Sequence, residues 1–216
     1  MNEPRVRRAY RSDRREAQTR QTRRRIIDGA TAVFLGRGYA GTTMRGIATA
    51  ARVSLPTVEL AFGTKARVLK AAIDVAIAGD DEAIAVLDRD WAGRALLAPT
   101  TDEFLSIVAG ILGPAQERSA GLVLALFEAS PTDPELAELA TQMIDQRATT
   151  ATWLVDALTQ RSPLRDGCTR AEAVDTVWLL MDPTVFDRLI RQRSWTRERY
   201  QQWFATAVER LLINDC

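Results

Sequence analysis

The chain has 216 residues, which is long enough to bury a substantial core as one domain or as a small and a larger domain. It contains no histidine and only two cysteines, Cys168 and Cys216, so Cys/His zinc sites, Ser-His-Asp triads and histidine acid–base catalysis are excluded. No run of about 18 apolar residues could span a bilayer, and the arginine-rich N-terminus lacks the apolar region of a secretory signal. We therefore expect a soluble, cytoplasmic protein.

The formal net charge of +1 conceals an uneven distribution of charge along the chain. Residues 1–70 contain sixteen Lys and Arg against five Asp and Glu, whereas residues 71–216 contain thirteen against twenty-three. A basic N-terminal part suits attraction to DNA phosphates, and an acidic remainder would be repelled by them. The alternative is that the arginine-rich segments are only solvated tails. The change of sign indicates a domain boundary.

Residues 1–15 carry many like charges and few apolar groups, so we expect a disordered basic arm. Such an arm either contacts DNA phosphates or the minor groove, or is a non-specific electrostatic tail. A helix with an apolar stripe is predicted from Glu16 onward, and Gly36 and Gly38 end it. The start of this helix offers candidates for DNA backbone contacts: Thr22, Arg23 and Arg24.

Residues 42–65 predict two short helices joined by a tight turn. Thr42 and Thr43 are good N-caps for the first helix, whose apolar residues recur at helical spacing. Ser54 can cap the second helix, in which Val58 and Phe62 point to the core. Three small or uncharged residues of this second helix are left facing outward: Leu55, Pro56 and Thr57. The pattern predicts a helix-turn-helix, whose second helix enters the DNA major groove by its N-terminal residues.

The pattern TT-x-x-x-IA-x-A-x-x-VS-x-x-T-V-x-x-x-F-x-x-K from Thr42 to Lys65, with FLGRGYAGT before it, resembles the TetR-type transcriptional repressors. Family resemblance and electrostatics both indicate a phosphate contact for Lys65. The set of residues that the helix-turn-helix and the resemblance together assign to DNA contact is Thr42, Thr43, Arg45, Ser54, Leu55, Pro56, Thr57, Glu59 and Lys65.

Two positions depart from the family pattern. Arg52 stands where the turn usually has glycine, and a left-handed conformation there costs on the order of 1 kcal/mol relative to glycine. Glu59 stands where the family commonly has a tyrosine that contacts phosphate, so we expect that contact to be lost. Either Arg45, Lys65 and the arginine arm compensate, or Glu59 reads a base, such as the amino group of a cytosine.

A long helix from Lys65 to about Ala78 is predicted to connect the two domains. In the proteins that the chain resembles, a shift of the equivalent helix changes the separation of the two recognition helices in a dimer. An acidic break follows, Gly79 to Glu82, which lacks the periodic oxygen ligands of a calcium site. We predict neither a metal site nor a cofactor.

The rest of the chain predicts further helices. Thr101 is predicted to cap a helix that is interrupted at Gly113–Pro114. Asp133 at the N-cap and Pro134 at the first helical position start another. The C-terminal part is predicted to contain a helix from a capping box at Thr169 to Glu172, a restart at Pro183 and a last helix from Thr196 to about Ile213.

This acidic, helical body is large enough to enclose an apolar pocket for a small inducer. The candidates to line it, each of which also suits an ordinary core position, are Phe127, Met143, Trp153, Trp178 and Met181. Its last two amphipathic helices either form a four-helix bundle with their symmetry mates in a dimer or only close the monomer's own core. The candidate dimer residues are Val174, Trp178, Phe186, Trp203, Phe204 and Leu211.

We therefore predict an all-α protein of about nine or ten helices. Its expected parts are the arm over residues 1–15, a three-helix DNA-binding domain over residues 16–64 and a larger bundle for ligand binding and dimerisation over residues 65–216. The predicted function is a homodimeric repressor that binds a pseudo-palindromic operator and is released by a small molecule. The alternatives are an all-helical enzyme, which the absence of histidine and catalytic motifs disfavours, and a sequence-tolerant DNA-binding protein driven by the arginine arm.

Overall fold

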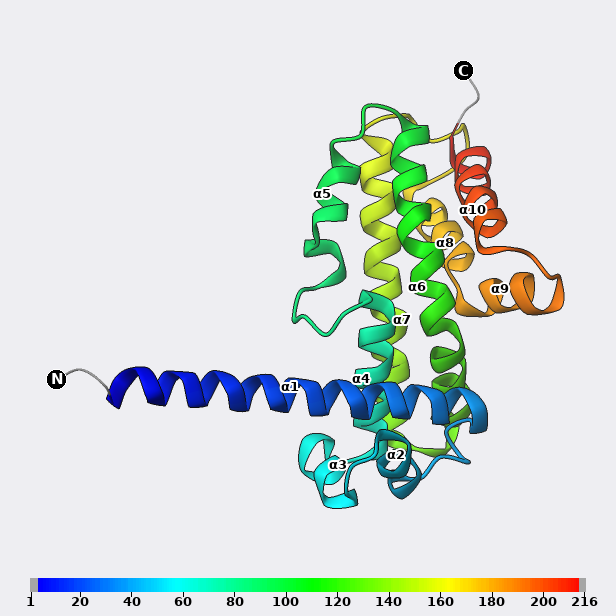
Figure 1. Ribbon diagram of the computed structural model, residues 1–216. Helices are drawn as coiled ribbons and strands as arrows, with labels where there is room; N and C mark the ends of the chain where they lie inside the picture. Colours follow the sequence, from blue (N-terminus) through cyan, green and yellow to red (C-terminus); the bar gives the residue numbers. More distant parts are fainter. Residues whose placement is uncertain (1–3, 214–216) are drawn as a thin grey trace. The chain divides into compact units, whose positions relative to one another are not determined.

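The computed structural model describes residues 4–213, with side chains from residue 17 onward. Within this range the chain forms ten α-helices and no strand, which confirms the predicted all-α fold (Figure 1). None of the described helices is long and apolar enough to cross a membrane. The helices are α1 (Pro4–Arg37), α2 (Met44–Ala51), α3 (Leu55–Phe62), α4 (Lys65–Ala78), α5 (Asp90–Leu96), α6 (Thr101–Ala129), α7 (Pro134–Thr159), α8 (Arg170–Leu180), α9 (Pro183–Asp187) and α10 (Arg197–Leu212).

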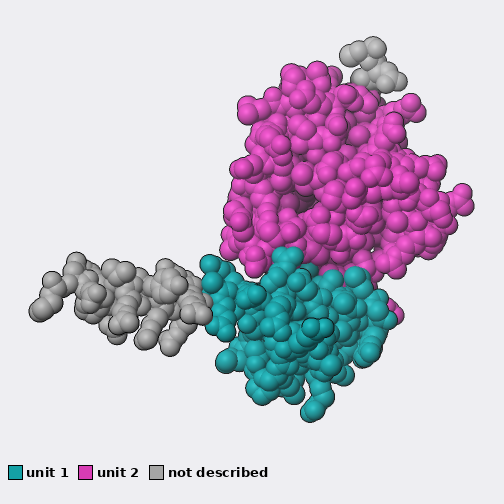
Figure 2. All heavy atoms as spheres, in the orientation of Figure 1, with its two compact units in different colours: residues 1–72 teal, residues 73–216 magenta. Residues whose placement is uncertain are grey.

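The chain divides into two compact units, Met1–Ala72 and Ile73–Cys216, coloured separately in Figure 2. The division falls within α4, whereas the sequence places the domain boundary at the first residue of that helix. Because one helix carries residues of both units, α4 is the covalent link between them.

Helix α1 begins earlier than the sequence indicates. The disordered arm was expected over residues 1–15, but the helix starts at Pro4, and residues 1–3 lie outside the described residues. Arginine and alanine are strong helix formers, and proline is well tolerated in a first turn, so this segment is helical without an apolar stripe. The helix ends as predicted, because Gly38 has φ +65° and its N–H donates to the carbonyl of Phe34.

The N-terminal unit is a small helical core. The apolar stripe of α1 meets α2, and Gly29 permits the close approach, since a Cβ there would lie 2.8 Å from the main-chain nitrogen of Ala51. The buried side chains come from all four helices: Ile26, Ile27 and Phe34, Ile47 and Ala48, Val58 and Phe62, and Val68 and Leu69.

The C-terminal unit is built on α6 and α7, with α5 on one side of this pair and α8, α9 and α10 on the other (Figure 1). Its main core cluster includes Phe104, Leu154, Leu158, Val177 and Phe204. Arg161, in the turn just after α7, fastens the end of α5 by donating to the main-chain carbonyls of Ala95, Leu96 and Ala98.

The predicted break at Gly113–Pro114 is wrong, because α6 runs unbroken through Pro114. Proline removes the hydrogen bond to the carbonyl four residues earlier, which here is that of Gly110. The side-chain amide of Gln201 in α10 lies 3.5 Å from that carbonyl oxygen and donates to it. Gly113 gives Gln201 room, since a Cβ at position 113 would lie 2.6 Å from its Cγ. A side chain distant in sequence therefore replaces the bond that the proline removes.

The predicted helix starts are mostly confirmed. Asp133 accepts from the first turn of α7, and Thr169 with Glu172 forms the capping box of α8. The cap of α6 is Thr100 and not Thr101, whose hydroxyl instead lies 2.9 Å from that of Ser162.

Candidate nucleic-acid interface

Helices α2 and α3 form the predicted helix-turn-helix, and both begin at the expected caps. The hydroxyl of Thr43 accepts from the N–H of Gly46 at 3.0 Å, and that of Ser54 accepts from the N–H of Thr57 at 3.3 Å. The hydroxyls of Ser54 and Thr57 also lie 2.7 Å apart. The leading turn of α3 is therefore fixed by its own side chains, which orients the end of the helix that would face a groove.

The turn between α2 and α3 is left-handed at Arg52, with φ 54° and ψ 46°. The sequence analysis considered a left-handed conformation at this position, where glycine is usual, and the structure shows that Arg52 adopts it. Arg25 of α1 offsets the strain, because its Nη2 donates at 2.8 Å to the carbonyls of both Ala51 and Arg52. Sequence inspection missed Arg25, since no local pattern shows which main-chain carbonyls a distant arginine meets.

The outward face of α3 consists of Pro56, Glu59, Leu60 and Ala61, which are exposed. Leu55, which the sequence predicted to face outward, is half-buried, because it lies three residues before the buried Val58 and therefore on the core side of the helix. Leu60 is 92% exposed, yet the sequence analysis did not select it. Its position two residues after Val58 was the available signal, because that spacing turns a side chain away from the core. Glu59 is exposed as expected for a residue that could approach DNA.

Two of the predicted DNA-contact residues are engaged inside the protein. Thr42 is 1% exposed and its hydroxyl donates to the carbonyl of Gly38 at 2.7 Å, so its side chain has no surface to offer DNA. The ammonium of Lys65 donates at 2.9 Å to the carbonyls of Tyr39 and Thr42, and it lies 3.9 Å from the centre of the Tyr39 ring. At least two of its three donors are thus used to hold the loop between α1 and α2.

Basic side chains surround the helix-turn-helix. Arg45 on α2 and Arg67 on α4 are exposed. Arg23 of α1 lies over the ring of Phe62 at 4.6 Å, and Arg24 pairs with Asp28 at 3.1 Å. Because α3 itself carries no basic residue, phosphate attraction has to come from these neighbouring elements.

The predicted pocket residues in the C-terminal unit do not gather around one hollow. Trp153, Trp178 and Met181 belong to the main core cluster, whereas Phe127 and Met143 lie outside it. Trp153 packs edge-on against Trp91 with ring centroids 5.4 Å apart. A hollow of about 320 Å³ lies elsewhere, and its lining consists of Arg165, Gly167, Cys168, Glu172, Thr176 and Leu211.

Trp178 has a charged neighbour that the sequence analysis missed. The guanidinium of Arg147 lies 4.2 Å from the Trp178 ring centre and pairs with Asp182 at 2.7 Å. Burial lowers the pKa of Arg147, and the Asp182 carboxylate opposes that effect. The pair therefore places a shielded charge beside two of the predicted pocket residues, Trp178 and Met181.

The predicted dimer residues divide into two groups. Phe186 and Phe204 are buried within the monomer and pack against Tyr200, so they serve the chain's own core, which was the stated alternative. The other predicted residues are half-buried or exposed: Val174, Trp178, Trp203 and Leu211. Leu179 on α8, which the sequence analysis did not select, is 58% exposed.

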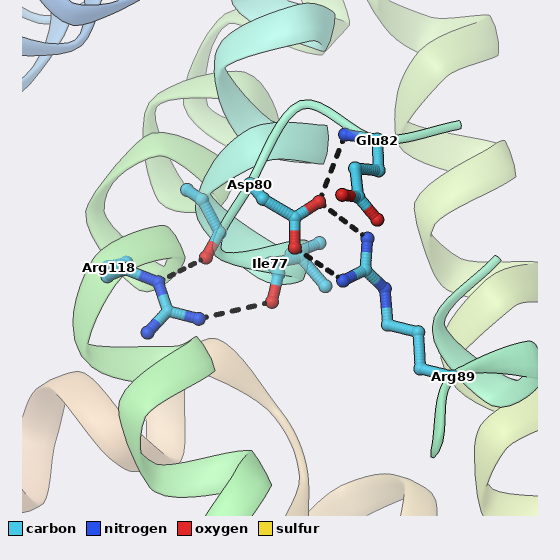
Figure 3. A network of polar contacts seen from close by, with 6 residues as sticks. Ile77, Asp80, Glu82, Arg89 and Arg118 are labelled. Carbon is cyan, nitrogen blue, oxygen red and sulfur yellow. Dashed lines mark hydrogen bonds and ion pairs between the residues drawn. The ribbon is translucent and has the colours of Figure 1, made fainter. Parts of the chain in front are cut away.

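The last turn of α4 is held by a polar network (Figure 3). Arg118 of α6 donates from Nε to the carbonyl of Ala76 at 2.8 Å and from Nη2 to that of Ile77 at 3.3 Å. Just beyond, both oxygens of Asp80 accept from Arg89, at 2.6 and 2.8 Å, and one also accepts from the N–H of Glu82. The hydrogen bonds to Asp80 raise the pKa of the Arg89 guanidinium. Asp80 therefore fixes the turn after α4.

Comparison with known proteins identifies the N-terminal segment. Residues 26–72, which include α2, α3 and the first part of α4, match the profile of the bacterial regulatory proteins of the tetR family. The comparison with curated proteins finds no match.

Solved structures resemble the chain over nearly its whole length. NalD of Pseudomonas aeruginosa, the secondary repressor of the MexAB-OprM multidrug efflux pump, is 20% identical, with 92% of this chain and 100% of that one covered and a TM-score of 0.66. A putative transcriptional regulator from Saccharomonospora viridis in complex with choline is 18% identical, with coverages of 89% and 98% and a TM-score of 0.67. SmeT in a complex with triclosan is 17% identical, with coverages of 90% and 92% and a TM-score of 0.64. At these identities the likeness shows a common fold.

Proposed function

We propose that the chain is a DNA-binding transcriptional regulator that represses transcription as a homodimer on a pseudo-palindromic operator and leaves the operator when a small molecule binds. The match of residues 26–72 to the tetR family of bacterial regulatory proteins supports this proposal. The observation that carries this proposal is the helix-turn-helix itself. Its caps are formed, its turn is held by Arg25, and the N-terminal turn of α3 is solvent-accessible.

The proposed DNA contacts are divided between two helix starts. The N-terminal turn of α3 enters the major groove with Ser54, Leu55, Pro56 and Thr57. The start of α2, with Thr43 and Arg45, contacts the phosphate backbone, where free main-chain N–H groups favour an anion. Lys65 acts through the loop that it holds, which leads directly into α2.

The proposed dimer interface combines α8 and α10. Leu179 and Leu211 are exposed, and Trp178 and Trp203 are half-buried. Large apolar side chains on two adjacent helices would be covered by the same helices of a second copy in a four-helix bundle. A dimer is needed for function because a single short recognition helix rarely binds one half-site tightly enough alone.

The proposed ligand site lies in the C-terminal unit, 73–216. Proteins of the same fold are found with choline and with triclosan, which supports a small-molecule response in this chain. Trp178 and Met181, with Arg147 beside them, are the predicted pocket residues around which we place it. Ligand binding would alter α6 or α7, and Arg118 is the contact by which α6 holds the end of α4.

Unbiased selection of bound DNA from a random pool, followed by footprinting, tests the function. We expect a discrete footprint with two related half-sites. Uniform protection that falls steeply with salt would instead show a sequence-tolerant binder, because phosphate contacts alone carry no sequence information. Catalytic turnover of a small molecule without DNA affinity would show an enzyme.

Single substitutions test the site. Thr57→Ala is expected to weaken operator binding by about tenfold, and Lys65→Ala to weaken binding to all sequences nearly equally. Thr149→Ala, an exposed threonine on α7, is the matched control and should bind as the unmodified chain does. Full operator affinity in both Thr57→Ala and Lys65→Ala would show that the interface is placed wrongly.

A further inference from the structure

The outward face of α3 is unusual in its chemistry. Glu59 is the only charged residue of the helix, which contains no Arg, Lys, Asn or Gln. The bidentate pairs by which those side chains recognise guanine and adenine are therefore not available from α3. The hydroxyls of Ser54 and Thr57 are directed at each other, 2.7 Å apart. What the face offers to a base edge is chiefly apolar surface and one carboxylate.

Leu60 provides most of that apolar surface. It is 92% exposed, the largest value among the exposed large hydrophobic residues of the described chain, so it adds almost nothing to the core. It lies one helical turn after Pro56, which is also exposed, and the two side chains therefore lie on the same side of α3. A helix whose N-terminal turn enters the major groove carries this strip along the base edges.

We propose that Leu60 is a specificity residue that contacts the C5-methyl group of a thymine in each half-site. This inference rests on the proposed function, since it requires an operator read by α3. The thymine methyl is the apolar group that the major groove presents, and an isobutyl side chain can cover it without leaving a polar group unpaired. Glu59, the adjacent exposed residue, would accept from the amino group of a neighbouring cytosine, so the half-site contains both pyrimidines.

The test uses the full chain and the operator obtained by selection. Each thymine is replaced singly by deoxyuridine, which lacks only the C5-methyl group, and the dissociation constant is measured by fluorescence anisotropy. At one thymine per half-site we expect the unmodified protein to lose affinity by about three- to fivefold. Leu60→Ala should bind the thymine operator more weakly than the unmodified protein does, by a similar factor. This variant should bind the thymine and deoxyuridine operators with equal affinity.

Controls separate reading from folding. Because Leu60 is exposed, Leu60→Ala should unfold at the same temperature as the unmodified chain. Leu97→Ala, whose side chain is 84% exposed in the C-terminal unit, should keep the full preference for thymine over deoxyuridine. If Leu60→Ala discriminates thymine from deoxyuridine as strongly as the unmodified chain at every position, the inference is wrong while the proposed function stands. If selection yields no operator at all, both are overturned.

Discussion

Both ends of α4 are held by hydrogen bonds from a cationic side chain to two main-chain carbonyls, but α4 supplies the donor at its start and the acceptors at its end. At its start, Lys65 of α4 donates to two carbonyls of another segment, those of Tyr39 and Thr42. At its end, Arg118 of α6 donates to two carbonyls of α4 itself, those of Ala76 and Ile77. The helix thus reaches out to hold the N-terminal unit and is itself held in the C-terminal unit.

The two attachments differ in protection from solvent. Lys65 is half-buried and lies against the Tyr39 ring, whereas Arg118 is exposed and one of its bonds is 3.3 Å long. Hydrogen bonds in contact with water contribute less to stability than shielded ones, because water replaces them when they open. We expect the end of α4 to open more readily than its start, so a ligand-driven change should act at the Arg118 attachment.

Lys65→Met should have the largest effect on stability. It removes the two charged hydrogen bonds to the carbonyls of Tyr39 and Thr42 and the contact with the Tyr39 ring. The expected loss is about 2–3 kcal/mol of unfolding free energy, measured by urea denaturation. Arg45→Met removes the same charge from the same unit at an exposed position and should cost less than about 0.5 kcal/mol. Equal losses in the two variants would show that charge alone matters.

Arg118→Met should have a smaller effect on the free energy of unfolding than Lys65→Met, but it should loosen the attachment of the end of α4 to α6. The expected loss is about 1–2 kcal/mol, with faster hydrogen exchange confined to the last turn of α4. Arg94→Met, at an exposed position on α5, is the matched control and should leave that exchange unchanged. Unchanged exchange in Arg118→Met would contradict the proposed attachment.

Gly79→Ala tests the turn directly beyond Arg118. Gly79 has φ +91°, and a Cβ there would lie 3.3 Å from the Arg118 Nη2, so we expect a loss of about 1 kcal/mol. Gly36→Ala in α1 is the counterpart, because its Cβ would meet nothing within 4 Å and its φ is helical. That variant should gain about 0.5 kcal/mol in thermal unfolding.

Asp80→Asn should have the smallest effect. The variant loses the ion pair with Arg89, in which the Asp80 side chain is 42% exposed, and exposed pairs contribute about 0.2–1 kcal/mol. The difference from the unmodified chain should shrink further in about 1 M salt, because screening weakens the pair. A difference that persists at high salt would show that the loss of the second acceptor oxygen, and not the loss of charge, is what destabilises the turn.

Local signals in the sequence predict the N-terminal unit well. The caps at Thr43 and Ser54 depend on residues within one turn, and the resemblance to the TetR-type repressors marked Arg52 as the turn position where glycine is usual. The side chains that hold these elements in place are distant in sequence: Arg25 and Arg118 donate to main-chain carbonyls of other helices. Propensity and periodicity carry no information about which distant backbone a long side chain meets.

Patterns of apolar residues also do not identify the partner that covers them. Phe186 and Phe204 have the spacing of interface residues, and the chain's own Tyr200 covers them. Leu60 is the opposite case. An apolar residue in a helix suggests a core position, but Val58 takes the buried side of α3 and Leu60 is exposed. For the two phenylalanines only the packing of the helices shows what covers them, whereas for Leu60 the spacing from Val58 already indicated exposure.

The contact between Gln201 and Gly110 implies an order of events during synthesis. The middle of α6 lacks one main-chain bond until α10 is present, and α10 is synthesised after α6 because it follows it in the chain. A nascent chain that ends before Gln201 should therefore hold α6 bent or frayed at Pro114. We expect the C-terminal unit to reach its final form only after α10 has been synthesised.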